Sequence, residues 1–284
     1  MKIGLVLSGG MAKGAYQIGA LKALRNFIPP DKIEYMSCAS VGVLNGYAYA
    51  TDRIDKIEAM WETLCGNVAK LTIGQLLKSE LLQDDINNLF APDKPVLNPF
   101  FCSLLDFDNR NLIYKDLSKV KNELIPSYLK ASVAMPIYNK PVTIESTPYF
   151  DGAMIDNIPV FPLINKDLDY IICVYFDDVC YKFENTDFDN KIIKISFPAI
   201  GKFRQSVVFK KDSIDYMMKD GFERTSKLLN SVFACGYDDT EYIYKEIEKL
   251  NATVGDNSLR VTGDVLVTNL NKITQRLMRK KILG

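Results

Sequence analysis

Residues 33–46 read Ile33-Glu34-Tyr35-Met36-Ser37-Cys38-Ala39-Ser40-Val41-Gly42-Val43-Leu44-Asn45-Gly46. An apolar run stops at Ser40 and small residues follow, which predicts a strand, a tight turn at the serine and then a helix. A serine at such a corner is pushed clear of the sheet, and its hydroxyl lies at the positive end of the helix. The segment 38–42 matches the nucleophile-elbow pattern G-x-S-x-G at its serine and second glycine. A buried small-residue turn without chemistry is the competing interpretation.

A second strand-to-helix junction lies near the amino terminus. The apolar run 3–7 predicts a buried strand, the spacing over 15–24 predicts a helix with Gln17 facing out, and a glycine-containing loop joins them. Amides at such a helix start can hold an anion, but the glycine spacing fits no phosphate-binding or dinucleotide fingerprint. The loop could instead form an oxyanion hole from the amides of Gly9, Gly10 and Met11, or be a tight turn only.

Composition narrows the function classes. The chain has 284 residues, 48% of them hydrophobic, and equal numbers of basic and acidic residues, 35 each. A formal net charge of zero gives no global field that would attract nucleic acid. The six cysteines contain no C-x-x-C pair, so we expect reduced thiols in a cytoplasmic protein. The amino-terminal apolar run is too short for a signal peptide, and the run 170–176 is far below the ~20 residues of a membrane span, so at most peripheral membrane contact is expected.

The chain contains no histidine. This excludes Ser-His-Asp and Cys-His catalysis within the chain, as well as histidine metal sites. A hydrolase built from this sequence must therefore activate its nucleophile with a carboxylate or a lysine. We expect no metal and no cofactor: Asp84, Asp85, Asp106 and Asp108 do not form a calcium-loop pattern and are predicted to lie on a solvated surface.

A candidate base follows a predicted hairpin. Segments 141–145 and 147–150 read as two strands that deliver Asp151-Gly152-Ala153 at their exit. An aspartate and a glycine after a strand usually make a plain turn. Asp151 becomes a candidate base if Ser40 needs one.

For the whole chain, we expect an α/β catalytic domain over 1–200 and a mostly helical region over 201–284 packed on it. Within the first, 71–122 is predicted to be an insertion that lies over the site. Helices are expected over 51–66, with Asp52 as its cap, Gly66 as its end and Trp61 in the core, and over 127–136, 201–230, 241–250 and 264–283; strands are expected over 170–176 and 191–197. The basic end of the last helix could contact an acidic membrane surface, although cations are ordinary at a helix carboxyl terminus.

Three motifs in a fixed order resemble the patatin-like phospholipase family. They are Gly9-Gly10-x-x-Lys13-Gly14, Ser40-x-Gly42 and Asp151-Gly152. The resemblance runs over roughly residues 1–165 and includes Ala131-Ser132-x-Ala134-x-Pro136 and Asp151-Gly152-Ala153-x-x-x-Asn157-x-Pro159. It implies an α/β fold, a three-layer α/β/α sandwich with a central mostly parallel sheet, and a Ser-Asp dyad that works without histidine.

The resemblance also implies roles for individual residues. Ser40 would be the nucleophile and Asp151 its base, the amides near Gly9, Gly10 and Met11 would form the oxyanion hole, and Lys13 and Gly14 would shape that loop. The implied activity is hydrolysis of a lipid or another acyl ester, of the phospholipase A or lysophospholipase kind. The chain departs from the family pattern at Met11 and Cys38, where glycines are usual, and a methionine with φ above zero would be strained.

Two other functions stay open at this point. The same acyl-enzyme could pass its acyl group to an alcohol, which would make the protein an acyltransferase. The departures at Met11 and Cys38 would also suit a non-catalytic lipid-binding protein on a degenerate hydrolase scaffold. A Cys38 nucleophile is disfavoured because the chain has no histidine to form a thiolate pair with it.

Overall fold

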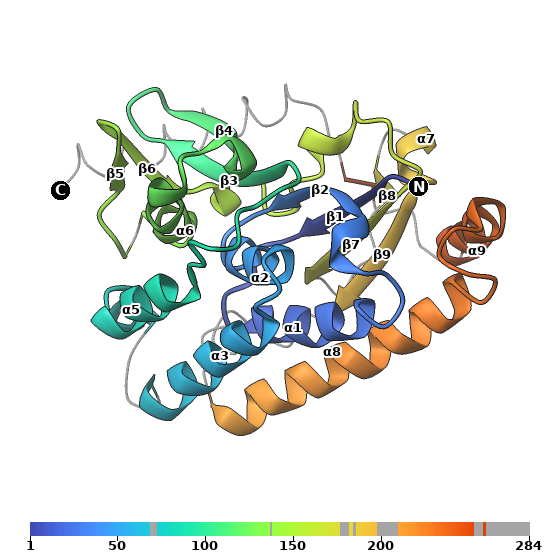
Figure 1. The fold of residues 1–284 in the computed structure, drawn as a ribbon, viewed down its shortest axis with the longest axis horizontal. Helices are drawn as coiled ribbons and strands as arrows, with labels where there is room; N and C mark the ends of the chain where they lie inside the picture. Colours follow the sequence, from blue (N-terminus) through green and yellow to red (C-terminus); the bar gives the residue numbers. More distant parts are fainter. Residues whose placement is uncertain are drawn as a thin grey trace.

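A mixed, mostly parallel sheet organises the chain (Figure 1). The computed structural model describes residues 1–68, 73–136, 138–176, 182–183, 186–197, 210–252 and 258–259. The strand order is β5-β6-β3-β2-β1-β7-β9, and β4 pairs with β3. The strands of this sheet are β1 (Ile3–Leu7), β2 (Ile33–Cys38), β3 (Phe100–Asp106), β4 (Asn111–Asp116), β5 (Val142–Ile144), β6 (Thr147–Asp151), β7 (Tyr170–Phe176) and β9 (Ile192–Phe197).

The parallel strands end in register. Leu7 on β1 lies opposite Cys38 on β2 and Val174 on β7. The loops that follow these strands therefore emerge at one edge of the sheet, which is where parallel α/β sheets place their ligands. Two short strands, β8 (Lys182–Phe183) and β10 (Ser258–Leu259), are paired with each other outside the main sheet.

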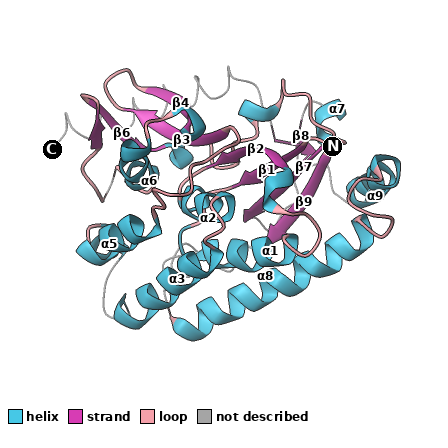
Figure 2. Cartoon of the chain, in the orientation of Figure 1, coloured by secondary structure: helices cyan, strands magenta, loops and turns pink. Residues whose placement is uncertain are grey.

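The helices are α1 (Gly14–Leu24), α2 (Val41–Ala50), α3 (Ile54–Val68), α4 (Ile73–Leu77), α5 (Glu80–Leu89), α6 (Ile125–Ser132), α7 (Thr186–Asp189), α8 (Lys211–Val232) and α9 (Thr240–Ala252). Figure 2 shows α8 running alongside α1 beneath the sheet. The two backbones touch, because a Cβ atom at Gly19 would lie 2.0 Å from the Met218 carbonyl oxygen and one at Gly221 would lie 2.3 Å from that of Tyr16. Glycine on both helices thus permits their close contact.

The core has two parts, one on each face of the sheet. Leu5 and Leu7 face the helical side, whereas Val6 belongs to a second cluster with Val160 and Leu163. On that second face, the chain after β6 and the short helix α7 cover the strands. Both faces are therefore buried, as expected of a mostly parallel sheet.

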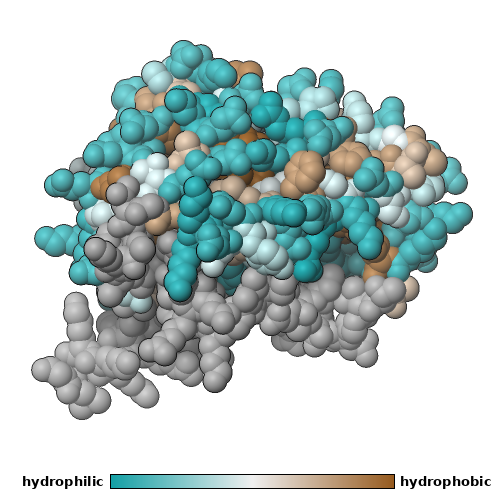
Figure 3. All heavy atoms as spheres, turned by 90° about the horizontal axis from the view of Figure 1, so that it is seen from below, coloured by the Kyte–Doolittle hydropathy of each residue, from teal (hydrophilic) through white to brown (hydrophobic). Residues whose placement is uncertain are grey.

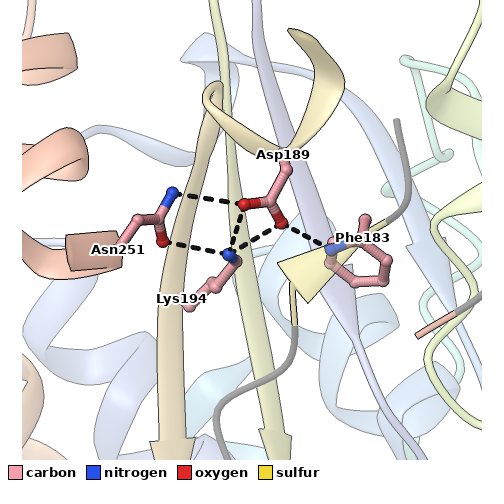
Figure 4. Close-up of polar contacts among 4 residues, drawn as sticks. All are labelled: Phe183, Asp189, Lys194 and Asn251. Carbon is pink, nitrogen blue, oxygen red and sulfur yellow. Dashed lines mark hydrogen bonds and ion pairs between the residues drawn. The ribbon is translucent and has the colours of Figure 1, made fainter. Parts of the chain in front are cut away.

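A buried polar cluster joins α9 to the edge of the sheet (Figure 4). Lys194 on β9 forms an ion pair of 2.7 Å with Asp189, and the two side chains are only 4% and 6% exposed. The Asp189 carboxylate also accepts hydrogen bonds from the Phe183 amide and the Asn251 side chain. Asn251 in turn accepts a hydrogen bond from Lys194 at 3.0 Å.

The structure corrects the expected insertion over 71–122. Residues 100–116 of that range form β3 and β4, and β3 pairs with both β2 and β6. The irregular pattern before Pro99 did not indicate the regular hairpin that follows it. In this hairpin, the mostly buried strand β3 is joined to β4 by a turn that contains Asn109. Among the described residues of the range, the α-helical segments are α4 and α5, and Ser79 caps α5 by accepting a hydrogen bond from the Leu82 amide.

Several predicted helix boundaries were also wrong. Helix α3 begins at Ile54 and not at residue 51, because Asp52 adopts φ 54° in the turn after α2 and pairs with Arg25 at 2.7 Å. At its other end the helix continues through Gly66 to Val68. Helix α6 begins at Ile125, with proline in its first turn, and ends at Ser132. The strand over 170–176 and the hairpin before Asp151 are present. Helix α8 covers 211–230 of the helical region expected over 201–230, whose residues 201–209 lie outside the described ranges, and α9 contains the helix expected over 241–250. The predicted helix over 264–283 lies outside the described residues.

Within the described ranges, every helix is too short or too polar to cross a membrane. Figure 3 shows that hydrophilic residues cover most of the described surface on the side viewed there.

Candidate active site

Ser40 occupies a strained corner between β2 and α2. Its backbone has φ 52° and ψ −132°, which non-glycine residues rarely adopt. The Ala39 amide donates to the Leu7 carbonyl at 3.0 Å, which fixes the corner against β1. A Cβ atom at Gly42 would lie 2.6 Å from the same carbonyl oxygen, so only glycine allows this approach. The strand, turn and helix predicted around Ser40 are therefore present.

Asp151 lies beside Ser40, at the end of β6. The Ser40 hydroxyl donates a hydrogen bond to its carboxylate, and the Ala153 amide donates another at 2.9 Å. The Asp151 side chain is almost completely buried. Burial raises the pKa of Asp151 to about 7, although the hydrogen bonds from Ser40 and Ala153 oppose the shift. A carboxylate with this pKa is half protonated near neutral pH, in the range suited to a general base.

The loop after β1 passes directly over the serine. A Cβ atom at Gly9 would lie 2.9 Å from the Ser40 Cβ, and one at Gly10 would overlap the Phe176 ring at 2.3 Å. Both glycines are therefore required by close approach. Among the residues that the structure describes, no acceptor is found for the amides of Gly10 and Met11.

Gly9 differs from the other two predicted oxyanion donors. Its amide donates to the Asn157 carbonyl at 3.1 Å, so it is already engaged. The chain after Asp151 thus provides an acceptor for the predicted oxyanion donor Gly9, and local sequence does not reveal this acceptor. Gly10 and Met11 remain as the candidate donors.

The other predicted loop residues have packing roles. Met11 has φ 52°, the left-handed conformation anticipated as a source of strain. The Lys13 ammonium lies 5.6 Å from the centre of the Phe176 ring. A Cβ atom at Gly14 would lie 2.8 Å from the Trp61 ring, so a larger residue would push α1 away from α3.

The thiol of Cys38 is a poor rival nucleophile. It is completely buried two residues before the corner at Ser40, and burial raises its pKa far above the usual range. The thiolate, which is the reactive form, is therefore not populated at neutral pH.

Residues 152–157 are held in place by hydrogen bonds that the sequence patterns did not indicate. The Tyr114 hydroxyl on β4 donates a hydrogen bond of 2.5 Å to Asp156. Burial raises the pKa of Asp156 to about 6, against the effect of hydrogen bonds from Tyr114 and Ile158. No local pattern indicated the Tyr114 contact, because β4 itself was not predicted. Asn157 lay within the quoted motif, but its carbonyl contact with Gly9 has no side-chain signature.

An apolar pocket opens beside Ser40. It is lined by leucines of α4 and α5, by side chains of α2 and α3, and by residues of the chain after α6; these include Met11, Leu44, Trp61, Leu76, Leu82 and Met135. The helical part of the segment 71–122 thus borders the pocket, whereas no residue of its strands β3 and β4 is among the described lining residues. Trp61, expected in the core, also lines this pocket.

No group of three or more histidine, cysteine or acidic residues that could hold a metal ion occurs within the described ranges. One of the acidic residues predicted to be solvated is buried: Asp106 accepts hydrogen bonds from the Asn109 backbone at 3.0 Å and side chain at 2.8 Å. It closes the β3–β4 turn, which explains its burial.

Comparison with solved structures identifies proteins of similar fold. VipD from Legionella pneumophila matches with a TM-score of 0.52 and 14% identity, over 80% of this chain and 66% of that one. ExoU in its complex with SpcU, from the type III secretion system of Pseudomonas aeruginosa, matches with a TM-score of 0.42 and 13% identity, over 89% and 58%. This chain spans 58% to 66% of the length of these two proteins. At such identity, the VipD match shows the fold alone.

A search of curated proteins returned no match. A protein-family model described as patatin-like phospholipase matches residues 5–164, which is more than half of the chain. The match spans the glycine loop, the Ser40 corner and Asp151. The chain belongs to the patatin-like phospholipase family.

Proposed function

We propose that this protein is a lipid acyl hydrolase in which Ser40 and Asp151 form the catalytic dyad. The observation that carries the proposal is the buried hydrogen bond between the two side chains, at the start of α2. Family membership supports hydrolysis of lipid acyl esters in general, and the apolar pocket beside Ser40 suits the acyl part of such a substrate.

The geometry supports a two-step reaction. Asp151 accepts the Ser40 proton while the serine oxygen attacks the ester carbonyl, and the negative charge then develops on the former carbonyl oxygen. The amides of Gly10 and Met11 donate to that oxygen, and the alcohol leaves with the proton. Water, deprotonated by Asp151, then cleaves the acyl-enzyme and releases the fatty acid. These two reaction steps need neither a histidine nor a metal ion.

The lining of the pocket supports a proposal for the substrate class. Leu44, Trp61, Leu76 and Leu82 present no charged group to a bound molecule, so they would accept the acyl chain and leave the head group outside. We therefore propose an ester of the phospholipid or lysophospholipid kind as substrate. Contact with a membrane surface is part of this proposal, although the basic segment 272–281 that suggested it lies outside the described residues.

Labelling with a fluorophosphonate probe tests the dyad directly. Intact-mass spectrometry should show one probe on the wild type, none on Ser40→Ala and much slower labelling of Asp151→Asn. Ser37→Ala is a matched control, because Ser37 is a buried serine on β2, the strand before the Ser40 corner, and takes no part in the proposed reaction. Asp167→Asn controls for loss of a carboxylate, since Asp167 lies on the surface.

Activity assays on the same variants test whether the protein hydrolyses esters or transfers acyl groups. Wild type and both controls should hydrolyse p-nitrophenyl esters, whereas Ser40→Ala should be inactive. Product analysis with added glycerol or lysolipid would reveal acyl transfer if an acylated alcohol forms in place of free fatty acid. A folded wild type that neither labels nor hydrolyses esters, yet binds lipid vesicles, would refute the proposal in favour of a lipid-binding role.

A further inference from the structure

Two buried amide side chains connect the glycine loop with the helix that follows Ser40. Gln17 on α1 donates from Nε2 to the Ser8 carbonyl at 2.8 Å. Asn45 on α2 donates from Nδ2 to the Gln17 Oε1 at 2.9 Å and to the Gly14 carbonyl at 3.0 Å. Ser8 and Gly14 are the residues on either side of the loop 9–13, so both ends of the loop are held.

The chain of hydrogen bonds continues to the pocket. The indole nitrogen of Trp61 on α3 donates to the Asn45 Oδ1 at 3.3 Å. Gln17 and Asn45 are completely buried, and Trp61 is 1% exposed. Burial of unpaired amides costs free energy, but here both ends of each amide side chain have partners. Gln17 was expected to face solvent; it is buried because the Ser8 carbonyl and Asn45 offer it hydrogen bonds inside the fold.

The peptide between Ser8 and Gly9 is held from both sides. Its carbonyl oxygen accepts from Gln17, and its N–H donates to the Asn157 carbonyl at 3.1 Å. A peptide unit is planar, so two hydrogen bonds at opposite ends fix its orientation. The next amides along the chain are those of Gly10 and Met11, whose direction depends on this plane.

The loop must also be placed relative to the serine. The loop belongs to the β1–α1 unit and Ser40 to the β2–α2 unit, so their separation depends on how α1 and α2 pack. Asn45 ties these helices together through two hydrogen bonds, and both end on α1. Apolar contacts alone tolerate sliding, whereas a fully satisfied buried polar network specifies one arrangement.

We propose that Gln17 and Asn45 are positioning residues for the catalytic reaction. They hold the Gly10 and Met11 amides at the place where negative charge develops when Ser40 attacks. This inference rests on the proposed function and adds to it two residues that touch neither the substrate nor the dyad.

The principal test is Gln17→Met, which keeps the side-chain length and removes both hydrogen bonds. Tyr49→Phe is the matched control: Tyr49 is buried on α2 and donates one hydrogen bond, to the Ile28 carbonyl, away from the site. Gln17→Leu is a second variant in case the first does not fold, since it also removes both hydrogen bonds but has a shorter and more rigid side chain. All are compared by thermal unfolding, by kcat and KM for p-nitrophenyl butyrate, and by hydrogen exchange of the peptides over 8–16.

We expect both Gln17 variants to fold and to lose kcat by about 10-fold to 100-fold, the scale expected when reacting groups are misplaced by ~1 Å. KM should change by less than about 3-fold, because the pocket that binds the acyl chain is unchanged and binds it equally in the ground state and the transition state. Hydrogen exchange over 8–16 should accelerate in both variants. Tyr49→Phe should retain wild-type kcat and exchange over 8–16 even if its stability falls.

Unchanged kcat in the folded Gln17 variants would overturn the inference, and so would a rise in KM alone. An equal loss of kcat in Tyr49→Phe would also overturn it, because the effect would then be one of general stability. A wild type without esterase activity would refute the proposed function instead. In that case, hydrogen exchange over 8–16 in the Gln17 variants still decides whether the Gln17 side chain holds the loop.

Discussion

Gly46 leaves the space that the Cys38 side chain occupies: a Cβ atom at Gly46 would lie 2.8 Å from the Cys38 Sγ. The strand before the corner and the second turn of α2 are therefore fitted to each other. The sequence alone presented Cys38 as a bulky departure from the elbow pattern. In the structure, a glycine on the facing helix compensates for it.

This fit predicts an energetic coupling between the two positions. Gly46→Ala should lower the free energy of unfolding by about 1–3 kcal/mol, the usual cost of overpacking a core. Adding Cys38→Ala removes the sulfur and should recover part of that loss, with a coupling energy above about 0.5 kcal/mol in a double-mutant cycle. Urea denaturation of the variants measures both quantities.

Cys102→Ala provides the control for this cycle. Cys102 is also buried and lies opposite Cys38 in the sheet, but it is not among the atoms closest to Gly46. Its substitution in the Gly46→Ala background should give no recovery. Equal recovery from both cysteine variants would contradict a specific fit between Cys38 and Gly46.

Activity should depend on the ionisation of Asp151. The base must be deprotonated, and the pKa of Asp151 is raised to about 7 by burial. We therefore expect kcat/KM for an uncharged ester to rise with pH, with a midpoint near the same value, and to level off above it. A pH-rate profile from pH 5 to 9 measures this, and a midpoint near pH 4 would contradict the proposed buried base.

The same pKa has a consequence for stability. Folding raises the pKa of Asp151 from an ordinary value of about 3.9, so the folded state binds more protons than the unfolded state between about pH 4 and 7. Its contribution to stability is present below this window and is lost as the pH rises through it. Relative to Asp151→Asn, the wild type should therefore lose on the order of 1–4 kcal/mol across the window. Urea denaturation at pH 4.5 and 8 gives the difference; a gain with rising pH would contradict it.

Met11→Gly should stabilise the protein. Met11 has φ 52°, a conformation that strains a methionine but not a glycine. After the entropy cost of glycine, we expect a gain of about 0.5–1 kcal/mol in the free energy of unfolding. Met135 also lines the pocket but does not have positive φ, so Met135→Gly should be destabilising. If thermal unfolding shows the same loss for both, strain at Met11 is not the deciding effect.

The buried ion pair of Figure 4 should matter far more than a surface pair of equal length. Lys194→Met leaves the Asp189 carboxylate buried without its cation and should cost about 3–5 kcal/mol. Lys2 pairs with Asp167 at the same distance of 2.7 Å on the surface, where water screens the charges, so Lys2→Met should change the free energy of unfolding far less than Lys194→Met does.

A second substitution checks the cause. Asp189→Asn in the Lys194→Met background removes the unpaired charge while retaining hydrogen-bonding groups, so it should restore part of the stability measured by urea denaturation. Failure to restore any would indicate that lost packing of the lysine stem, not the buried charge, dominates.

Local signals in the sequence were sufficient for the elements that hold Ser40. The buried runs over 3–7 and 170–176 and the corner after Cys38 have clear apolar patterns, and the structure contains all three. Strand β3 was missed because prolines and short apolar pairs before it resembled an irregular insertion. Its place between β2 and β6 depends on pairing with distant segments, which no local pattern encodes.

The site was harder to predict where backbone groups decide it. Gly9 was expected to offer its amide to substrate, but the Asn157 carbonyl accepts it. Gln17 interrupts an apolar helix and was assigned to the solvent side by its polarity alone. In both cases the partner of the polar group lies far along the chain, and only the fold brings it near.

Trp61 is the only tryptophan in the sequence. Its ring lines the pocket beside Ser40, and its indole nitrogen ends the hydrogen-bond chain that begins at Ser8. Indole emission responds to local polarity and hydrogen bonding, so the tryptophan fluorescence of this protein reports on the pocket beside Ser40 alone. Entry of an acyl chain can thus be followed in the unmodified protein, without a label and without turnover.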